Sequence, residues 1–191
     1  MYENPFIRAF VAVPIDDPLR ATLADLLSRF RDTEARVRWV PEANLHLSLA
    51  FLGNTARDDL SVLANALNDA CRTCVPTMLE ARCIGSFGSP RSPRVLWVGV
   101  APDACLMTLQ ARVRDAIEQA GYPLESRPYH PHITLGRVKH SRGLGAVRTI
   151  MEARRDEVFG QWPLREVLLM QSRLDSGGAV YAPLHHALLD A

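Results

Sequence analysis

Two short segments of the sequence each place a histidine and a hydroxyl residue two positions apart among apolar neighbours. His46 and Ser48 lie in NLHLSLAFLG, and His132 and Thr134 lie in HPHITLGR. An imidazole titrates near pH ~6.5, so one of two facing histidines can accept a proton while the other donates one. The hydroxyls can donate hydrogen bonds to phosphate oxygens. Together the two segments predict acid–base cleavage of a phosphodiester.

The spacing within each segment suits a β-strand. In a strand, residues two apart share a face, so each histidine projects to the same side as its hydroxyl residue. The opposite face of both segments is expected to be apolar, with Leu45, Leu47, Leu49, Phe51, Ile133 and Leu135. In a chain with six histidines, only about 0.1 such patterns are expected by chance. Two of them therefore indicate one shared site on rigid elements.

Other chemistries fit the two segments less well. A zinc site usually has at least three protein ligands, and neither segment carries Asp, Glu or Cys on its histidine face. Ser48 lacks the G-x-S-x-G elbow of hydrolase nucleophiles. Cys71 and Cys74 form a C-x-x-C pair without a second pair at zinc-finger spacing, and we interpret them as small apolar residues. We expect no metal and no other cofactor.

Strand and helix patterns alternate along the chain in an order that occurs twice. The first half predicts strands near 6–14, 35–40, 45–52 and 78–87, and helices near 17–30 and 60–71. We place the N-cap of the first helix at Asp17, with Pro18 at the first helical position. The second half predicts strands near 94–100, 132–138, 164–173 and 179–189, an extended piece at 123–127, and helices near 106–117 and 144–158.

The repeated order indicates an internal duplication. The two histidines lie 86 residues apart (132 minus 46), and the first strands of the halves lie about 88 apart (94 minus 6). We predict one α+β domain over 1–191, with two pseudo-symmetric lobes and approximate halves 1–90 and 91–191. Antiparallel or mixed sheets flanked by helices would leave an active-site cleft between the lobes. SFGSPRSP, rich in Pro, Gly and Ser, is expected to connect the halves.

Charge and hydropathy narrow the partners. The 22 Lys and Arg against 21 Asp and Glu give a net charge of +1, so any attraction to a polyanion must be local. Local cations do lie near the histidine segments: Arg36, Arg38, Arg91, Arg94, Arg137, Lys139, His140 and Arg142. The first residues, MYENPFIRAF, do not resemble a secretory leader, and no apolar run in the sequence reaches membrane-spanning length, so we expect neither feature. We expect a cytoplasmic monomer that does not bind a membrane.

The paired segments resemble the signature of the two-histidine phosphoesterase superfamily, in which each of two H-x-[ST]-x motifs is followed by an apolar residue. Within it, the sequence is most similar to the bacterial and archaeal RNA 2',3'-cyclic phosphodiesterases, historically called 2'-5' RNA ligases. The resemblance covers nearly the whole chain: RAFVAVP, W followed by NLHLSLAFLG, PRVLWVGV, PHITLGR, and LLMQSRL with YAPL. Ser48 departs from the commoner threonine but retains the hydroxyl.

This resemblance implies a substrate and a role for each motif residue. The substrate would be RNA with a terminal 2',3'-cyclic phosphate, transfer-RNA fragments among them, and the product a 2'-phosphate. Joining of 2'-5' ends would be a reverse side activity. His46 would be the proton donor to the departing 3'-oxygen and His132 the proton acceptor that activates water, while Ser48 and Thr134 would bind the phosphate. The residues alone do not distinguish acid from base, because the two motifs are chemically equivalent.

Arg137 matches a family arginine that contacts the phosphate. It lies five residues after His132, and this odd offset would point it to the opposite face of a regular strand. The role therefore requires a bend or a bulge at Gly136.

Four further residues are weaker candidates for substrate contacts. Phe51, Trp39 and Tyr129 could stack on a nucleobase. For Phe51, however, the strand pattern favours a core position. Arg94 could meet RNA phosphates or remain solvated.

Two alternative functions remain open. An RNA-binding module without turnover would need hydroxyls and cations, but not two matched proton carriers. A phosphodiesterase of cyclic nucleotides or 2'-5' oligonucleotides would use the same catalytic groups on a smaller substrate. Rates on mononucleotide and RNA substrates would separate this last alternative from an RNA 2',3'-cyclic phosphodiesterase.

Overall fold

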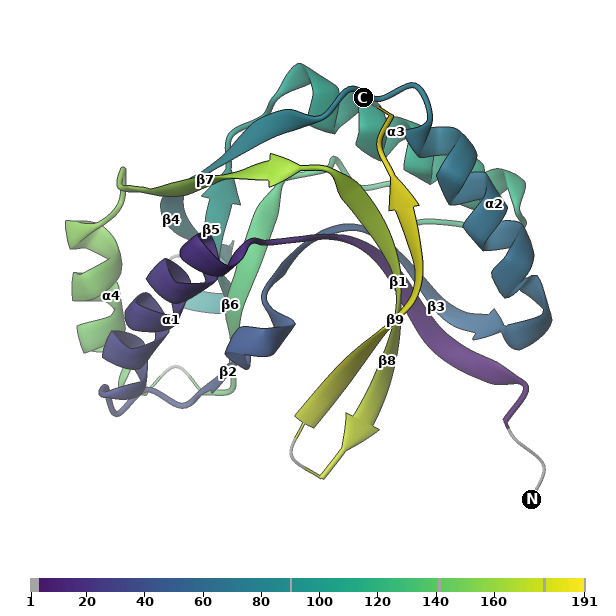
Figure 1. The fold of residues 1–191 in the computed structure, drawn as a ribbon. Coiled ribbons are helices and arrows are strands. Elements are labelled where there is room, and N and C mark those ends of the chain that lie inside the picture. Colours follow the sequence, from purple (N-terminus) through teal and green to yellow (C-terminus); the bar gives the residue numbers. More distant parts are fainter. Residues whose placement is uncertain (1–3, 90, 141, 177, 191) are drawn as a thin grey trace.

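The computed structural model describes residues 4–89, 91–140, 142–176 and 178–190. Figure 1 shows a strongly curved sheet with helices on its outer side. The strands are β1 (Phe6–Pro14), β2 (Val37–Trp39), β3 (His46–Ala56), β4 (Thr77–Ser89), β5 (Ser92–Val100), β6 (His132–Val138), β7 (Val158–Leu164), β8 (Glu166–Asp175) and β9 (Gly178–Leu188). The helices are α1 (Asp17–Arg31), α2 (Leu60–Cys71), α3 (Ala104–Gln119) and α4 (Leu144–Ala153), with 3₁₀ turns η1 (Glu42–Asn44) and η2 (Arg57–Asp59).

The strands form one sheet in the order β7-β4-β5-β6-β3-β1-β8-β9, with β2 paired to β6 outside this path. Every recorded strand pairing is antiparallel. In the middle, β3 and β6 pair only at Leu47 and Ile133. The α+β class is therefore confirmed, with a single curled antiparallel sheet that is narrowest between the two histidine strands.

The two sides of this narrow point each combine strands from both halves of the sequence. β4, from the first half, pairs with β5 and β7, while β8, from the second half, pairs with β1 and β9. The order is nevertheless symmetric about the centre, since β3 and β6 are followed outward by the first strands of the halves, β1 and β5. The internal duplication stays a prediction, and this symmetric order is compatible with it.

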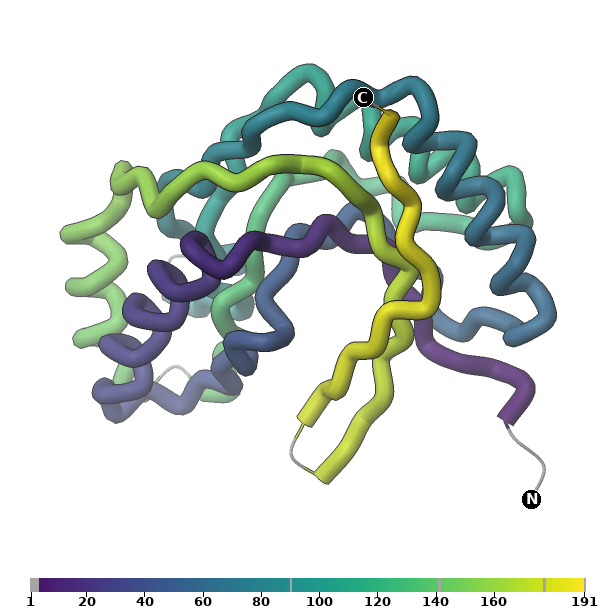
Figure 2. The backbone as a smooth tube through the Cα atoms, viewed as in Figure 1, coloured from purple at the N-terminus to yellow at the C-terminus, as the bar shows by residue number. Residues whose placement is uncertain are grey.

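The core lies between the outer face of the sheet and the helices. Alternate residues of the central strands, among them Val11, Leu47 and Ile133, are fully buried on this face. α1 packs on β7, α2 packs on β9 and on α3, and α3 packs on β3, so helices flank both arms of the arch in Figure 2. The apolar stripe of α1 faces this core, because its five members are all buried: Leu19, Leu23, Leu26, Leu27 and Phe30.

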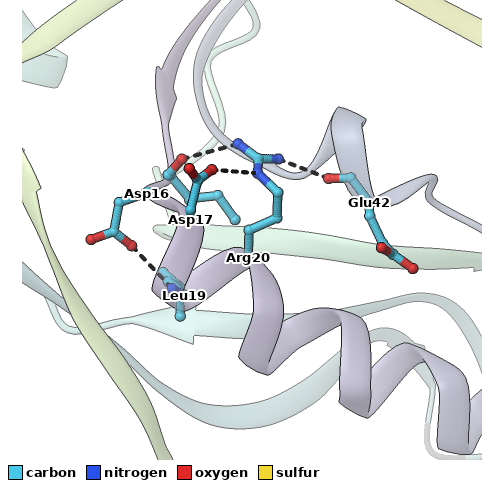
Figure 3. A network of polar contacts seen from close by, with 6 residues as sticks. Asp16, Asp17, Leu19, Arg20 and Glu42 are labelled. Carbon is cyan, nitrogen blue, oxygen red and sulfur yellow. Dashed lines mark hydrogen bonds and ion pairs between the residues drawn. The ribbon is translucent and has the colours of Figure 1, made fainter.

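The start of α1 is tied to the turn that precedes β3. The N-cap is Asp16, one residue before the predicted Asp17, and its carboxylate accepts the Leu19 N–H at 3.0 Å. The Arg20 guanidinium donates to the carbonyl oxygens of Ile15 at 3.0 Å and Glu42 at 2.8 Å (Figure 3). This bridge fixes η1 against α1, and β3 follows η1 with His46 at its first position.

The structure differs from the predicted elements in three places. Residues 123–127 form no strand. α4 ends at Ala153 instead of 158, because the carbonyl oxygens of Arg155 and Glu157 accept N–H groups of β4. The chain then forms β7, which was missed because Gly160 and Pro163 interrupt its strand pattern.

The segment SFGSPRSP joins the halves as a β-hairpin and not as a separate linker. β4 extends to Ser89 and β5 begins at Ser92, so most of the segment is strand. Its Pro90 lies outside the described residues.

Candidate active site

The single pairing of β3 with β6 brings the two predicted motifs side by side. Leu47 and Ile133 are opposite each other and fully buried on the outer face of the sheet. The residues that flank them in each strand must therefore point to the inner face. These residues are His46, Ser48, His132 and Thr134, all of them half-buried.

His46 is held by two hydrogen bonds and two aromatic rings. Its Nδ1 lies 2.7 Å from the Asn44 carbonyl oxygen, and its Nε2 lies 2.9 Å from Ser48 Oγ. The ring centroid is 5.0 Å from that of Phe10 on β1 and 5.5 Å from that of Tyr181 on β9. Because a carbonyl oxygen can only accept, Nδ1 carries a proton and the neutral ring presents the Nε2 lone pair to the site.

His132 is oriented in the same way by different neighbours. Its Nδ1 lies 2.6 Å from the His130 carbonyl oxygen, which again leaves Nε2 for the site. The ring meets Phe87 of β4 edge-on at a centroid distance of 4.8 Å, and Trp97 of β5 lies at 6.3 Å. The Trp97 ring lies so close to Gly85 that any side chain there would collide with it. An aromatic wall therefore supports this histidine.

Burial lowers the pKa of both histidines below the ordinary value of 6.5. In both cases a backbone hydrogen bond opposes this effect, through Asn44 for His46 and through His130 for His132. Positive charge on His132 lowers the pKa of His46 further, while His130 and Arg137 do the same for His132. The two rings are thus electrostatically coupled, and both are predominantly neutral at pH 7.

A bulge in β6 brings Arg137 to the inner face. Trp97 pairs with Thr134 but its neighbour Leu96 pairs with Gly136, so Leu135 is an extra residue in β6. Leu96 is buried in the core, whereas Arg137 pairs with Val95 on the side of Trp97. Arg137 therefore shares a face with His132 and Thr134, as its predicted role requires, and it is exposed.

Bulges in β3 correct the predicted position of Phe51. Two extra residues, Leu49 and Leu52, interrupt the pairing of β3 with β1, and Phe51 pairs with Phe10. Phe51 therefore lies on the inner face with a ring centroid 6.1 Å from Phe10, and it is 65% exposed. The expected core position was wrong because strict alternation does not survive a bulge.

The other sequence candidates lie in different settings. Trp39 stacks on buried Phe30 at 5.2 Å on the core side, which removes it from the nucleobase contacts. Tyr129 is half-buried and donates its hydroxyl to the Ser48 carbonyl oxygen at 3.0 Å, so it links the loop before β6 to β3. Arg94 is exposed in a bulge of β5, where Phe87 pairs with Val95 and Gly88 with Pro93.

Sequence reasoning missed the aromatic residues that hold the two imidazoles. Phe10, Phe87, Trp97 and Tyr181 come from four different strands, and none is close in sequence to a histidine motif. Only Trp97 carried a signal, as the one indole in the strand that opens the second half.

Two surface hollows lie away from the histidines, one between α2 and α3 and one along β1 between Asn4 and Arg173. Among the residues that the structure describes, no group of three His, Cys, Asp or Glu side chains gathers as a metal site. No helix in the described ranges combines the length and apolarity that crossing a bilayer requires. Figure 1 shows that the curved sheet has a concave face. The active-site cleft between two lobes stays a prediction.

Comparison with known proteins places this arrangement in a family. Residues 15–175 match the sequence model of the 2'-5' RNA ligase superfamily. A Methanothermobacter thermautotrophicus protein named RNA 2',3'-cyclic phosphodiesterase is 30% identical over 178 residues, covering 93% of this chain and 96% of its own. An Archaeoglobus fulgidus protein of the same name is 31% identical over 178 residues, with 93% and 98% covered.

The fold agrees with this sequence similarity. The crystal structure of a Thermus thermophilus protein superposes with a TM-score of 0.79 at 28% identity, covering 96% of this chain and 98% of the other. The family match spans most of the chain and includes both histidine motifs. The chain therefore belongs to the 2'-5' RNA ligase superfamily.

Proposed function

We propose that this protein hydrolyses the terminal 2',3'-cyclic phosphate of RNA to a 2'-phosphate, with His46 as general acid and His132 as general base. The observation that carries the proposal is the pairing of Leu47 with Ile133, which sets both histidines on one sheet face. The names of the similar archaeal proteins, RNA 2',3'-cyclic phosphodiesterase, support the substrate.

Both imidazoles are oriented for proton transfer at Nε2. Each Nδ1–H is engaged by a backbone carbonyl oxygen, of Asn44 for His46 and of His130 for His132. Neither ring can flip without losing this bond, so the tautomer is fixed. The same geometry serves a neutral base and a protonated acid, because Nε2 accepts in the first state and donates in the second.

The charges around the rings favour this assignment of acid and base. Burial lowers the pKa of His132 most, and positive charge on His130 and on the permanent cation Arg137 lowers it further, which favours the neutral ring that a base requires. The charge that lowers the pKa of His46 comes from His132, and it disappears when His132 is neutral. A bound phosphate anion then raises the pKa of His46 toward the protonated form.

The reaction balances with water as the only co-reactant. His132 Nε2 accepts a proton as the water oxygen bonds to phosphorus. The bond from phosphorus to the 3'-oxygen breaks, and His46 Nε2–H protonates the departing oxygen. Each proton transfer contributes on the order of 10² to 10⁴ in rate. With an RNA hydroxyl in place of water as the nucleophile, the same groups would join the cyclic-phosphate end to that hydroxyl through its 2'-phosphate, and the 3'-oxygen would again leave with the proton from His46.

Phosphate binding falls to three side chains on the same face. Ser48 is already within hydrogen-bond distance of His46 Nε2, and its hydroxyl can turn to a phosphate oxygen when that ring is protonated. Thr134 occupies the equivalent place beside His132, opposite Trp97. The Arg137 guanidinium offsets the charge that develops on the equatorial oxygens. This set works without a metal ion.

Two weaker contacts complete the proposed substrate site. Phe51 presents an exposed ring beside Phe10, which suits stacking of a nucleobase. Arg94, on the hairpin of β4 and β5, can meet a phosphate of the incoming strand. We take the enzyme to act as a monomer in the cytoplasm on RNA ends, transfer-RNA fragments among them.

The test uses a short RNA that ends in a 2',3'-cyclic phosphate. This RNA is incubated in the presence of EDTA with the parent protein, with His46→Ala and with His132→Ala, each in a separate reaction. The parent should form a 2'-phosphate, and each variant should be at least about 100-fold slower. The matched control is His186→Ala, because His186 belongs to neither motif, lies on the edge strand β9 three strands from β3, and contacts Glu166 at 2.8 Å. It should keep parental activity.

Other outcomes would redirect the proposal. No turnover of RNA together with tight RNA binding would identify a binding module. Faster turnover of a cyclic mononucleotide than of RNA would identify a small-molecule phosphodiesterase. A 3'-phosphate product would reverse the assignment of the leaving oxygen.

A further inference from the structure

We propose that Arg38 and Arg137 form a two-arginine site that also holds the phosphodiester preceding the terminal nucleotide, so that the enzyme selects oligonucleotides over cyclic mononucleotides. This inference rests on the proposed function. It adds Arg38, which lies outside both histidine motifs, to the substrate site. It also adds a second phosphate to the part of the substrate that the enzyme contacts.

The register of β2 places Arg38 on the inner face. β2 pairs with β6 so that Arg38 is opposite Arg137 and Trp39 is opposite Gly136. Side chains of directly opposite residues lie on one face of a sheet. Trp39 faces the core, where it stacks on Phe30. Arg38, its neighbour in the strand, must therefore point the other way, with Arg137.

The same assignment follows from β5, on the other side of β6. Val95 pairs with Arg137, and Phe87 pairs with Val95. Phe87 touches the ring of His132 at a centroid distance of 4.8 Å, so this row of residues belongs to the histidine face. Arg38 thus extends the row that runs from Phe87 through Arg137 across three adjacent strands.

The two guanidinium groups are like charges at directly opposite positions of a sheet. Such pairs are destabilising, and directly opposite Cβ atoms lie only ~5 Å apart. Both side chains are exposed. Neither takes part in any ion pair formed among the described residues. The pair therefore lacks a carboxylate to balance it, and an anionic ligand would relieve the repulsion.

The chemistry of the guanidinium group identifies the anion. Arginine binds phosphate through two parallel N–H donors, with a fixed fork that suits planar, bidentate contacts. The charge of Arg137 already reaches His132, since it lowers the pKa of that ring. Arg137 can therefore serve the cyclic phosphate, and Arg38, one strand further from the histidine, the next phosphate along the RNA. A cyclic mononucleotide has no such second phosphate.

The experiment compares two substrates that differ by one nucleotide and one phosphodiester: 2',3'-cyclic AMP and the dinucleotide ApA with a terminal 2',3'-cyclic phosphate. We expect Arg38→Gln to lower kcat/KM for the dinucleotide about 10-fold more than for the mononucleotide, the size of one charge-assisted contact. Most of the change should be in KM. The slope of log(kcat/KM) against log[salt] for the dinucleotide should become shallower by about 0.7.

Two controls separate a phosphate contact from a general effect. Arg29→Gln removes an exposed arginine from the outer helix α1 and should leave kcat/KM unchanged for both substrates. A dinucleotide with an uncharged methylphosphonate linkage should lose the advantage of ApA with the parent and show no further loss with Arg38→Gln. In addition, Arg38→Gln should raise the Tm by about 1–3 °C, because it removes the like-charge pair.

The outcomes distinguish this inference from the proposed function. Turnover of both substrates by the parent, with equal losses on both in Arg38→Gln, would refute the second phosphate contact and leave the catalytic proposal intact. No turnover of either substrate by the parent would refute the catalytic proposal itself.

Discussion

His46 on β3 and His132 on β6 each donate an Nδ1 hydrogen bond to a carbonyl oxygen two residues earlier, but the groups around the two rings differ. His46 contacts Phe10 and Tyr181, and its Nε2 already has a hydroxyl partner in Ser48. Around His132 the neighbours include a permanent cation, Arg137. Two motifs that look equivalent in sequence thus occupy unlike electrostatic settings. The proposed assignment of acid and base therefore rests on these surroundings and not on the motifs.

The largest expected effect tests whether His46, and not His132, is the acid that protonates the leaving 3'-oxygen. A substrate with sulfur in place of the 3'-oxygen releases a thiolate, whose conjugate acid has a pKa of about 8.5, and it needs little help from an acid. His46→Ala should therefore be 10² to 10⁴-fold slow on the oxygen substrate, on the order of one lost acid, but within about 10-fold of the parent on the sulfur substrate. His132→Ala should stay slow on both.

Rates on the two substrates check the assignment directly. Rescue of His132→Ala instead of His46→Ala would exchange the acid and the base. Rescue of neither would show that departure of the 3'-oxygen does not limit the rate.

A smaller effect concerns the bulge at Leu135 of β6, which brings Arg137 to the inner face. A Cβ at Gly136 would lie 2.7 Å from both Trp39 and Val37 on β2. Gly136→Ala should therefore lower the free energy of unfolding by about 1–3 kcal/mol, the cost of overpacking. Gly145→Ala in α4 is the control, because a Cβ there meets nothing within 4 Å. It should be neutral or stabilising by up to about 1 kcal/mol.

Urea unfolding of both glycine variants measures this difference. Activity measurements extend this comparison, because displacement of β2 in Gly136→Ala should also weaken the contribution of Arg38 to kcat/KM for the dinucleotide. Equal stability of Gly136→Ala and Gly145→Ala would show that β2 adapts to a side chain without cost.

The smallest effect concerns pH. The folded-state pKa of both histidines lies below the ordinary value of 6.5, so the unfolded chain binds protons more readily. Their contribution to stability is complete above pH 6.5 and is lost as the pH falls through the unfolded value toward the folded one. Each histidine can contribute at most about 1.4 kcal/mol per pH unit.

Thermal unfolding at pH 7.5, 6.5 and 5.5 would show a falling Tm, with a shallower fall in His46→Gln and His132→Gln. If the Tm instead rose on acidification, the pKa of the histidines would be raised by folding. The two variants also compare the halves of the site, since the one with the larger effect marks the more strongly shifted ring.

Local patterns in the sequence predicted the elements and the two histidine motifs. The stripe of α1 and the alternation of β6 depend on neighbours within one turn or one strand, so they can be read without the fold. The family resemblance supplied the requirement for a bulge near Gly136, and the structure has it at Leu135. The face of Phe51 was wrong, because the bulges of β3 depend on how β1 pairs with it.

The rest of the site depends on pairings between distant segments. Arg38 acquires its place only through the register of β2 on β6, and Phe87 meets His132 only because β4 lies beside β5. β7 was missed because its Gly160 and Pro163 are tolerated at the edge of the sheet, where one side needs no partner strand. Non-local registers of this kind leave no trace within a single segment.

The exchange of strands between the halves has a consequence for synthesis on the ribosome. β1 and β3 are synthesised before β8 and β9, which complete their side of the sheet. Tyr181, which contacts the His46 ring, belongs to β9. A nascent chain therefore exposes the unpaired edge of β1 until β8 has been synthesised. We expect His46 to reach its final geometry only once β9 has paired with β8, so that shorter nascent chains should lack the proposed activity.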